Sequence, residues 1–223
     1  MNILLVSATE FEVSPFITAH GLKLQSTGFY SGKANGHVVD CIITGIGMVA
    51  ITYSLTKILR KSSYELLINV GIAGAFHSEL AIGNVVEIVS DRFADLGIDD
   101  NGNYKDAYEE KLVKADNFPF AGGWMKNPTT FDFLNALPKQ IGITVNTVSG
   151  SKERIELMKR KYNPGTESME GAAFFYVALS ESIPFFQIRA ISNKVEPRNK
   201  KNWNISLAIE NINSTLIDTF GRF

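Results

Sequence analysis

Residues 167–194 constrain the fold more than any other part of the chain, because two apolar segments follow each other there. Residues 172–179 are apolar almost all round, which predicts a helix buried on most of its surface. Pro184 ends this helix, and the apolar run 185–191 is typical of a central strand in a sheet covered on both faces. This pair of segments indicates a sheet that lies between layers of helices.

Strands and helices alternate along the rest of the sequence, with one hairpin. The dipeptide Asn35-Gly36 joins two strand-like segments and is the strongest short signal for a β-hairpin, so the sheet is expected to be mixed. The expected strands are 3–8, 24–34, 37–44, 66–70, 85–89, 143–148 and 185–191, and the expected helices start near residues 9, 48, 129, 151, 171 and 203. We expect one α/β domain over residues 1–223, with three layers, α/β/α, around a mixed central sheet.

Two segments interrupt this alternation. Four of the five residues 71–75 are glycine or alanine, and the segment follows a strand, which predicts a tight turn that lets a ligand approach the backbone. Residues 95–127 are polar, contain glycines and show no clear periodicity. A segment of this length is usually a functional lid, a partner contact or disorder, and its aromatic residues argue against disorder.

Composition and charge narrow the classes of function. The chain has 223 residues, 45% of them hydrophobic and 20% charged, which is typical of a globular protein. A net charge of −1 gives no reason to expect nucleic-acid binding, and no apolar run reaches the ~20 residues that would cross a membrane. The one cysteine, Cys41, lies in an apolar strand, so we expect a buried thiol, no disulfide and a cytoplasmic location.

Three polar residues stand where strands end or helices begin. Glu12 follows the first strand, Glu170 starts the buried helix, and Asn193 follows the strand 185–191. Ligands of open α/β sheets bind at that edge, so a carboxylate pair and a carboxamide there predict a site. Structural roles remain open as well: Glu12 fits a capping box with Thr9, Glu170 suits a helix N-terminus, and Asn193 suits a turn. Glu10 is a second acid beside Glu12, and the sequence does not separate the two.

Several familiar chemistries are poorly supported. Gly45-x-Gly47-x-x-Ala50 matches a dinucleotide fingerprint, but the next strand ends without the acid that would hold the ribose. The three histidines are scattered, and neither a G-x-S-x-G nor a phosphate-loop motif is present. We therefore expect neither a metal nor a cofactor, and acid–base chemistry on a neutral polar substrate.

Six segments together resemble the purine nucleoside phosphorylase and nucleosidase superfamily. They are S-A-T-E-F-E-V, T-G-I-G-M-V-A, N-V-G-I-A-G-A, T-V-S-G, E-S-M-E-G-A-A and I-R-A-I-S-N, in that order along nearly the whole chain. The resemblance implies a nucleoside phosphorylase-like fold, a small-molecule nucleoside substrate, and a homodimer or higher homo-oligomer.

The resemblance also implies roles for individual residues on the sugar side of the site. Glu170 would bind the ribose hydroxyls, and Met169 would pack against the sugar beside Ser168. Glu12 would position the attacking water and take its proton.

On the base side, Asn193 would contact the purine at N7, next to Ser192. The backbone of Ile72, Ala73 and Gly74 would line the purine pocket.

The sequence departs from the superfamily pattern in three ways. Adenine-cleaving nucleosidases have Asp where this chain has Asn193, and an amide that both donates and accepts suits a 6-oxopurine such as hypoxanthine. Adenosine-type nucleosidases carry an aromatic residue soon after V-S-G, whereas residues 151–153 here are Ser, Lys and Glu. Stacking on the base would therefore come from elsewhere, with Phe120 and Trp124 as candidates. No arginine precedes Arg60, which favours water over phosphate as the nucleophile.

Alternatives stay open. The chain could be a methylthioadenosine/S-adenosylhomocysteine nucleosidase, a 6-oxopurine nucleoside phosphorylase or a non-catalytic nucleoside-binding protein. Within the superfamily, one nucleosidase substrate carries a carboxylate beyond the sugar. Arg92, Arg198 and Lys200 are the candidates to receive such a group.

Overall fold

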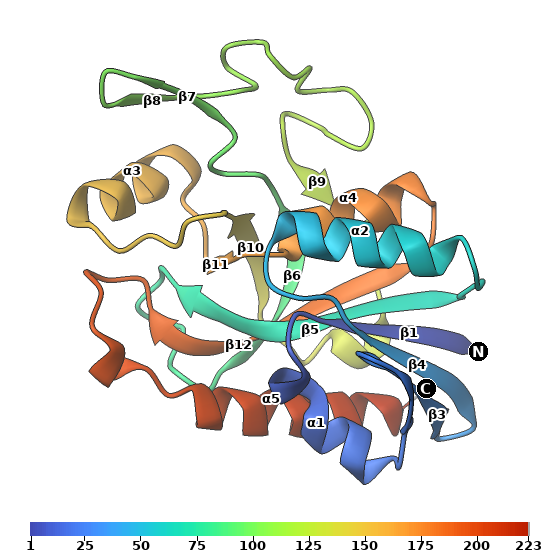
Figure 1. The fold of residues 1–223 in the computed structure, drawn as a ribbon. Coiled ribbons are helices and arrows are strands. Elements are labelled where there is room, and N and C mark those ends of the chain that lie inside the picture. The colour runs from blue at the N-terminus through green and yellow to red at the C-terminus, as the bar shows by residue number, and fades with distance from the viewer. Residues whose placement is uncertain (223) are drawn as a thin grey trace.

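The computed structural model describes residues 1–222 and has a mixed sheet between two layers of helices (Figure 1). The strands of the main sheet are β1 (Asn2–Ser7), β2 (Lys23–Ser26), β3 (Phe29–Ala34), β4 (His37–Ile43), β5 (Leu66–Ala75), β6 (Val85–Asp91), β9 (Met125–Lys126), β10 (Lys139–Thr144), β11 (Thr166–Ser168) and β12 (Phe185–Lys194). The helices are α1 (Glu10–Ala19), α2 (Met48–Leu59), α3 (Lys152–Tyr162), α4 (Gly171–Ser180) and α5 (Ile205–Phe220), with short 3₁₀ turns η1 (Asp132–Leu134) and η2 (Lys200–Asn202).

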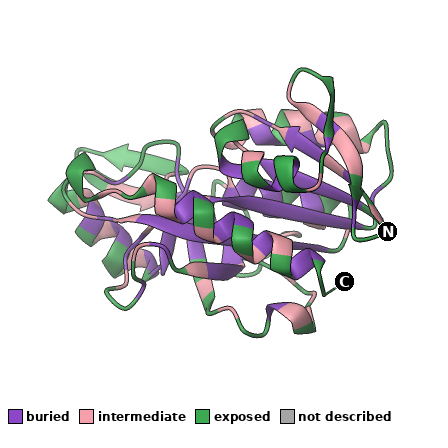
Figure 2. Ribbon diagram, turned by 90° about the horizontal axis from the view of Figure 1, so that it is seen from below, coloured by how far each residue is buried: buried purple, intermediate pink, exposed green. Residues whose placement is uncertain are grey.

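The two faces of the sheet are buried by different helices, as the alternation of side chains along a strand requires. In β1, Ile3 and Leu5 pack into a core with α1 and α5, whereas Leu4 and Val6 pack into a core with α2 and α4. Figure 2 shows the central strands buried and the outer surfaces of the helices exposed. The expected α/β/α arrangement around a mixed sheet is therefore confirmed.

The sheet order brings the carboxyl ends of its central strands to one edge. β12, β5, β1 and β4 are parallel neighbours in that order, and β6 pairs antiparallel with β12. In Figure 1, β5 and β12 point toward the same side of the molecule. Parallel strands with helices on both faces bind ligands at that edge.

The hairpin at Asn35-Gly36 is present as expected, and both residues have positive φ, of 47° and 83°. The strand expected over 24–34 is instead two strands, β2 and β3, because Gly28 turns the chain there with φ of 70°. The strand expected at 143–148 overlaps β10 at residues 143 and 144 only, because β10 begins at Lys139 and ends at Thr144.

The turn expected at residues 71–75 is absent. These small residues continue β5 as far as Ala75, because they pair with β12 along one side and with β11 near their end. Pairing on both sides overrides the weak strand propensity of glycine and alanine. The backbone therefore reaches the edge of the sheet with Ile72 as the one large side chain of this segment.

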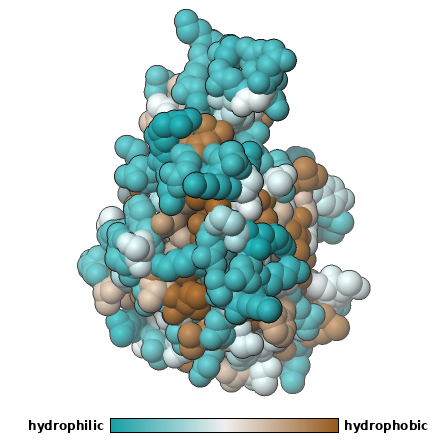
Figure 3. All heavy atoms as spheres, turned by 90° about the vertical axis from the view of Figure 1, so that its left-hand side faces the viewer, coloured by the Kyte–Doolittle hydropathy of each residue, from teal (hydrophilic) through white to brown (hydrophobic). Residues whose placement is uncertain are grey.

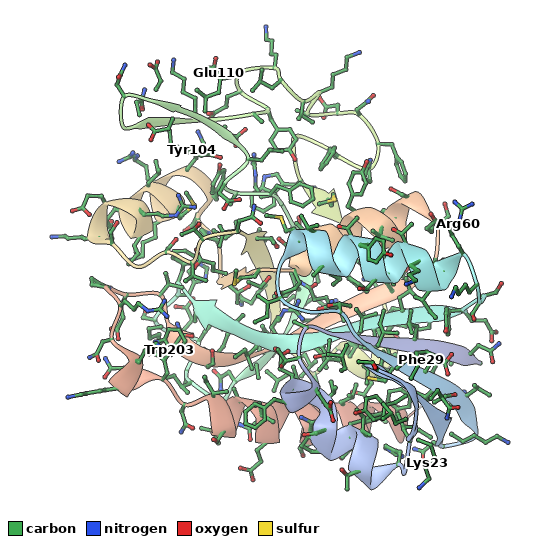
Figure 4. All side chains as sticks on the ribbon, viewed as in Figure 1. Lys23, Phe29, Arg60, Tyr104, Glu110 and Trp203 are labelled. Carbon is green, nitrogen blue, oxygen red and sulfur yellow. The ribbon has the colours of Figure 1, made fainter. Side chains whose placement is uncertain are left out.

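Residues 95–127 form an extension beside the sheet, with a hairpin of β7 (Gly97–Asp100) and β8 (Asn103–Asp106) (Figure 1). The buried side chain of Arg92 stabilises the start of this extension. Its guanidinium pairs with Asp106 and lies over three aromatic rings, those of Tyr108, Trp124 and Tyr162. Figure 4 shows Tyr104 and Glu110 on this extension at the top of the molecule, and Trp203 lower down on the left.

Cys41 lies in β4 and is fully buried, and its burial raises the pKa of the thiol to about 12. Within residues 1–222, none of the helices combines the length and the hydropathy that crossing a bilayer requires.

Candidate active site

A cavity of about 430 Å³ lies at the carboxyl edge of β1, β5 and β12. It is lined by all nine residues expected to act on the sugar or to contact the base at N7 and along β5: Glu12, Ile72, Ala73, Gly74, Ser168, Met169, Glu170, Ser192 and Asn193. Figure 3 views the molecule from the side to which β5 and β12 point, and apolar atoms show there between hydrophilic ones.

Glu12 is buried at the start of α1, and its two carboxylate oxygens have separate tasks. Oε1 accepts a hydrogen bond of 3.0 Å from the backbone N–H of Ile72 in β5. Oε2 accepts from the backbone N–H and the hydroxyl of Thr9, both at 2.9 Å, and from the hydroxyl of Ser7 at 3.2 Å. The capping interaction expected with Thr9 is therefore real, and the same carboxylate faces the cavity. Glu10 is exposed and does not line it.

Glu170 precedes the first residue of α4 and is held from another part of the chain. Its Oε1 accepts a hydrogen bond of 2.8 Å from the backbone N–H of Gly47, at the start of α2. Burial raises the pKa of Glu170, while the positive charge of Arg189 and the Gly47 hydrogen bond act in the opposite direction.

Arg189 supplies the positive charge beneath these acids, although it lies in the middle of an apolar strand. It is 2% exposed, and burial lowers its pKa while the charges of Glu170, Glu12 and Asp91 raise it. Nη1 of Arg189 and Oε1 of Glu12 both lie close to Gly71. A Cβ added to Gly71 would be 3.3 Å from Nη1 of Arg189 and 2.8 Å from Oε1 of Glu12. A side chain at residue 71 would therefore separate the pair.

Asn193 presents an amide whose orientation is fixed by its neighbours. Its Oδ1 accepts a hydrogen bond of 2.8 Å from the Ser192 hydroxyl, and its Nδ2 donates one of 2.9 Å to the Lys194 carbonyl. One further acceptor position and one further N–H remain on the amide. A ligand in the cavity can therefore meet both a donor and an acceptor.

The sequence did not point to Glu167 and Trp203 as site residues, yet both line the cavity. Glu167 is buried, and its oxygens accept from the backbone N–H and the hydroxyl of Ser149 at 2.8 and 2.6 Å. Trp203 is half-buried, and the guanidinium of Arg198 lies 5.3 Å from the centre of its ring. A buried strand of three residues, β11, carries Glu167, and nothing in its short polar sequence marks it as a strand.

Four residues that the sequence suggested for stacking on the base or for binding a carboxylate lie away from the cavity. Phe120 and Trp124, the candidates for stacking on a base, belong to the 95–127 extension, where they pack against Tyr108 and Tyr162 respectively, and they do not line the cavity. Arg92 is buried with Asp106, and Lys200 is exposed outside the cavity. Of the three candidate cations, Arg198 alone borders it. No residue of 95–127 lines this cavity.

The part of the chain that the structure describes contains no cluster of metal-binding side chains. No three histidine, cysteine, aspartate or glutamate side chains there are arranged to hold an ion.

Two facing acids, an oriented amide and a strand edge of small residues form a site for a neutral polar ligand. The model of the phosphorylase superfamily matches residues 2–219, which is nearly the whole chain. The chain belongs to the phosphorylase superfamily. Two relatives of this chain carry the names of two different activities. The chain is 27% identical over 212 residues to a futalosine hydrolase of Thermus thermophilus, covering 92% of this chain and 89% of the relative.

It is 26% identical over 180 residues to a 5′-methylthioadenosine/S-adenosylhomocysteine nucleosidase of Haemophilus influenzae, covering 77% of this chain and 75% of the relative. The fold is also similar to the solved structure of the futalosine hydrolase of Helicobacter pylori, with a TM-score of 0.83, 16% identity, and coverage of 100% of this chain and 98% of that one. The phosphorylase-superfamily fold is thereby confirmed, and the relatives of this chain are nucleosidases.

Proposed function

We propose that the protein is a nucleosidase that hydrolyses the N-glycosidic bond of futalosine, releasing hypoxanthine and dehypoxanthine futalosine. The observation that carries the proposal is the convergence of Glu12, Glu170 and the Asn193 amide in one cavity. The match to a futalosine hydrolase over 92% of this chain supports the substrate.

In the proposed reaction, the bond between C1′ and N9 breaks, and its electron pair leaves with the base. Positive charge develops on the ribose, and the negative charge of Glu170 stabilises it while its carboxylate orients the sugar hydroxyls. Glu12 accepts a proton from water as the water oxygen bonds to C1′. The base takes up a proton from solvent at N7, and Asn193 accepts that N7–H and donates to O6.

The charges of the cavity support water rather than phosphate as the nucleophile. Among its lining residues, Arg198 is the one arginine or lysine, and Arg189 is buried beneath the acids. An oxyanion beside the sugar would meet Glu12 and Glu170 without the cluster of cations that phosphate requires.

A methylthioadenosine/S-adenosylhomocysteine nucleosidase is the second candidate, because one such enzyme is a relative of similar identity. Asn193 argues against it, since an amide has no acidic proton to give to the N7 of a departing adenine. The discriminating experiment incubates the protein with futalosine, inosine and methylthioadenosine, each with and without phosphate, and measures the free base by chromatography. Release of adenine in preference to hypoxanthine, or release that requires phosphate, would contradict the proposal.

We further propose that the protein works as a homodimer in the cytoplasm. An apolar groove of about 940 Å³ runs between α2 and α4, and Val49, Tyr53 and Tyr176 along it are 82%, 65% and 41% exposed. An exposed apolar patch of this kind is typical of a protein contact. Light scattering after gel filtration should give twice the chain mass, and Val49→Glu should give a monomer.

A further inference from the structure

Asp91 is the centre of a buried hydrogen-bond network beneath the first turn of α4. It is 1% exposed at the end of β6, and a Cβ added to Gly171, the first residue of α4, would overlap its Oδ2. The backbone N–H of Arg92 and the hydroxyl of Thr144 donate to Oδ1 at 2.8 and 2.9 Å. Nε2 of Gln187 donates to Oδ2 at 3.2 Å. The reaction proposed above gives this buried acid no task.

One arm of the network caps α4. The hydroxyl of Thr144 gives its single proton to Asp91, so its oxygen is left to accept, and the backbone N–H of Ala172 donates to it at 2.7 Å. Glu170 stands at the position before this helix, yet its side chain makes no capping hydrogen bond. Because Thr144 satisfies a backbone N–H of the first turn, the carboxylate of Glu170 can bond Gly47 and line the cavity instead.

The other arm reaches the guanidinium that both acids of the cavity share. Nε2 of Gln187 donates to Asp91, and Oε1 of the same amide accepts from Nη2 of Arg189 at 3.4 Å. Asp91, Gln187 and Arg189 are each at most 2% exposed, so solvent does not compete for these bonds. Nη1 of the same guanidinium lies close to Glu12 beside Gly71. The direction of the Gln187 amide therefore affects where the positive charge lies.

A group that only accepts at position 91 gives both arms their direction. An ionised carboxylate donates nothing, so every neighbouring donor can point at it. Burial raises the pKa of Asp91 to about 6, which leaves the carboxylate ionised in neutral solution. An amide here would turn its NH2 toward another donor, either Nε2 of Gln187 or the backbone N–H of Arg92. If Gln187 turned over in response, it would present its own NH2 to Arg189. A buried donor without an acceptor is costly in each case.

We infer that Asp91 is a positioning residue for Glu12 and Glu170, the two acids of the cavity. The arm through Gln187 holds the guanidinium beside Glu12, and the arm through Thr144 holds the start of α4 behind Glu170. This inference rests on the proposed nucleosidase function and adds to it a residue that does not line the cavity. Small displacements of catalytic groups cost large factors in rate, so the network affects turnover without touching the substrate.

The test is calorimetric titration of wild type and Asp91→Asn, at about pH 8, with hypoxanthine and with 9-deazainosine. The second probe joins a similar base to ribose through a carbon–carbon bond, which hydrolysis does not break. Asp91→Asn should weaken 9-deazainosine binding roughly tenfold, because the acids that contact the sugar shift, and leave hypoxanthine binding within about twofold. Its kcat on futalosine should fall roughly 10–100-fold. Asp218→Asn, an exposed acid on α5, is the control and should match wild type in all three measurements.

The arm through Thr144 is tested separately, which keeps the inference falsifiable if Asp91→Asn does not fold. Thr144→Val keeps the shape of the side chain without its hydroxyl and should weaken 9-deazainosine binding several-fold. Thr144→Ser keeps the hydroxyl and should bind both probes as wild type does. Equal 9-deazainosine affinity of the Val and Ser variants would overturn the inference, because the hydroxyl would then hold nothing in place.

Equal weakening of both probes in Asp91→Asn would also overturn it, since Asp91 would then only support the fold. The same holds if wild type binds 9-deazainosine no more tightly than hypoxanthine, because no sugar contact would exist for Asp91 to position. These titrations need no turnover. A failure of wild type to hydrolyse futalosine would therefore count against the proposed function and not against positioning by Asp91.

Discussion

The backbone N–H of Gly47 donates to Oε1 of Glu170 at 2.8 Å, across 123 positions of the sequence. Gly47 has a φ of 96°, a conformation that side chains rarely adopt, and it opens α2 with its N–H directed at the acid. The glycine pair at 45–47 resembled a dinucleotide fingerprint in the sequence. Its role in the fold is to carry the backbone to a carboxylate of the cavity.

Replacing Glu12 should remove most of the activity without removing the site. In Glu12→Gln, the amide cannot take a proton from water, so turnover of futalosine should fall roughly 10²–10⁴-fold. Hypoxanthine binding should remain within a few-fold of wild type. Glu10→Gln is the matched control, because Glu10 is exposed on the same helix turn. Near-normal turnover of the Glu12 variant would exclude it as the base.

Glu170 should set an acid limit to the activity. Burial raises its pKa, and the ionised form is the one that stabilises the cationic sugar, so kcat/KM should fall as the pH drops through that raised value. The decline should begin at a higher pH than an exposed glutamate would give. A pH profile of kcat/KM for wild type and Glu170→Gln measures this. The variant should be slower at every pH, and the limb assigned to Glu170 should be missing from its profile.

Asn193→Asp should shift the choice of leaving base toward adenine. The new carboxyl group can donate a proton to N7 of adenine but no longer donates an amide N–H to O6. We expect the ratio of kcat/KM for futalosine to that for methylthioadenosine to fall at least tenfold, measured by competing the two substrates in one reaction. An unchanged ratio would show that the amide does not read the base.

Gly71→Ala should inactivate the enzyme while leaving it folded. The added Cβ would lie 2.8 Å from Oε1 of Glu12 and 3.3 Å from Nη1 of Arg189, so both charged groups must shift. Turnover should fall more than tenfold, since small displacements of a catalytic group cost large factors in rate. Gly150→Ala is the control, because its Cβ would meet only the Cβ of Arg198, at 3.7 Å. Circular dichroism and the melting temperature verify folding.

Asp91 should make the protein less stable as the pH rises from about 4 to about 6. Burial raises its pKa from 3.8 to about 6 in the folded chain, although Thr144, Gln187 and Arg189 favour its ionised form. The folded state then holds a proton that the unfolded state has released, so the free energy of unfolding decreases across this window. Asp91→Asn should remove a decrease of roughly 2–3 kcal/mol. Urea denaturation of both proteins at several pH values isolates the contribution of Asp91 from that of the other acids.

The sequence was informative where the signal is local. Asn35-Gly36 predicted its hairpin, and the apolar segments at 172–191 predicted a buried helix and a buried strand. Glu12 stood out because it follows the first strand, and Glu170 because it precedes the buried helix. Their common edge followed from the parallel arrangement of covered strands.

The remaining features depend on pairing between distant segments. Gly71 and its neighbours continue β5 because strands on both sides hold them, a condition that local propensity does not contain. Glu167 enters the cavity through β11, whose three residues form a strand only beside β10 and β5. Arg189 could have been noticed as a lone charge in an apolar strand, but its three acidic neighbours come from separate elements.

One guanidinium is the common counter-ion of Glu12, Glu170 and Asp91. Removing any one of these acids leaves the positive charge of Arg189 to interact with the other two. Each substitution therefore changes the electrostatic environment of the acids that remain. The effects of substitutions within this quartet will therefore not add, and double-mutant cycles, rather than single variants, are the measurement that apportions catalysis among them.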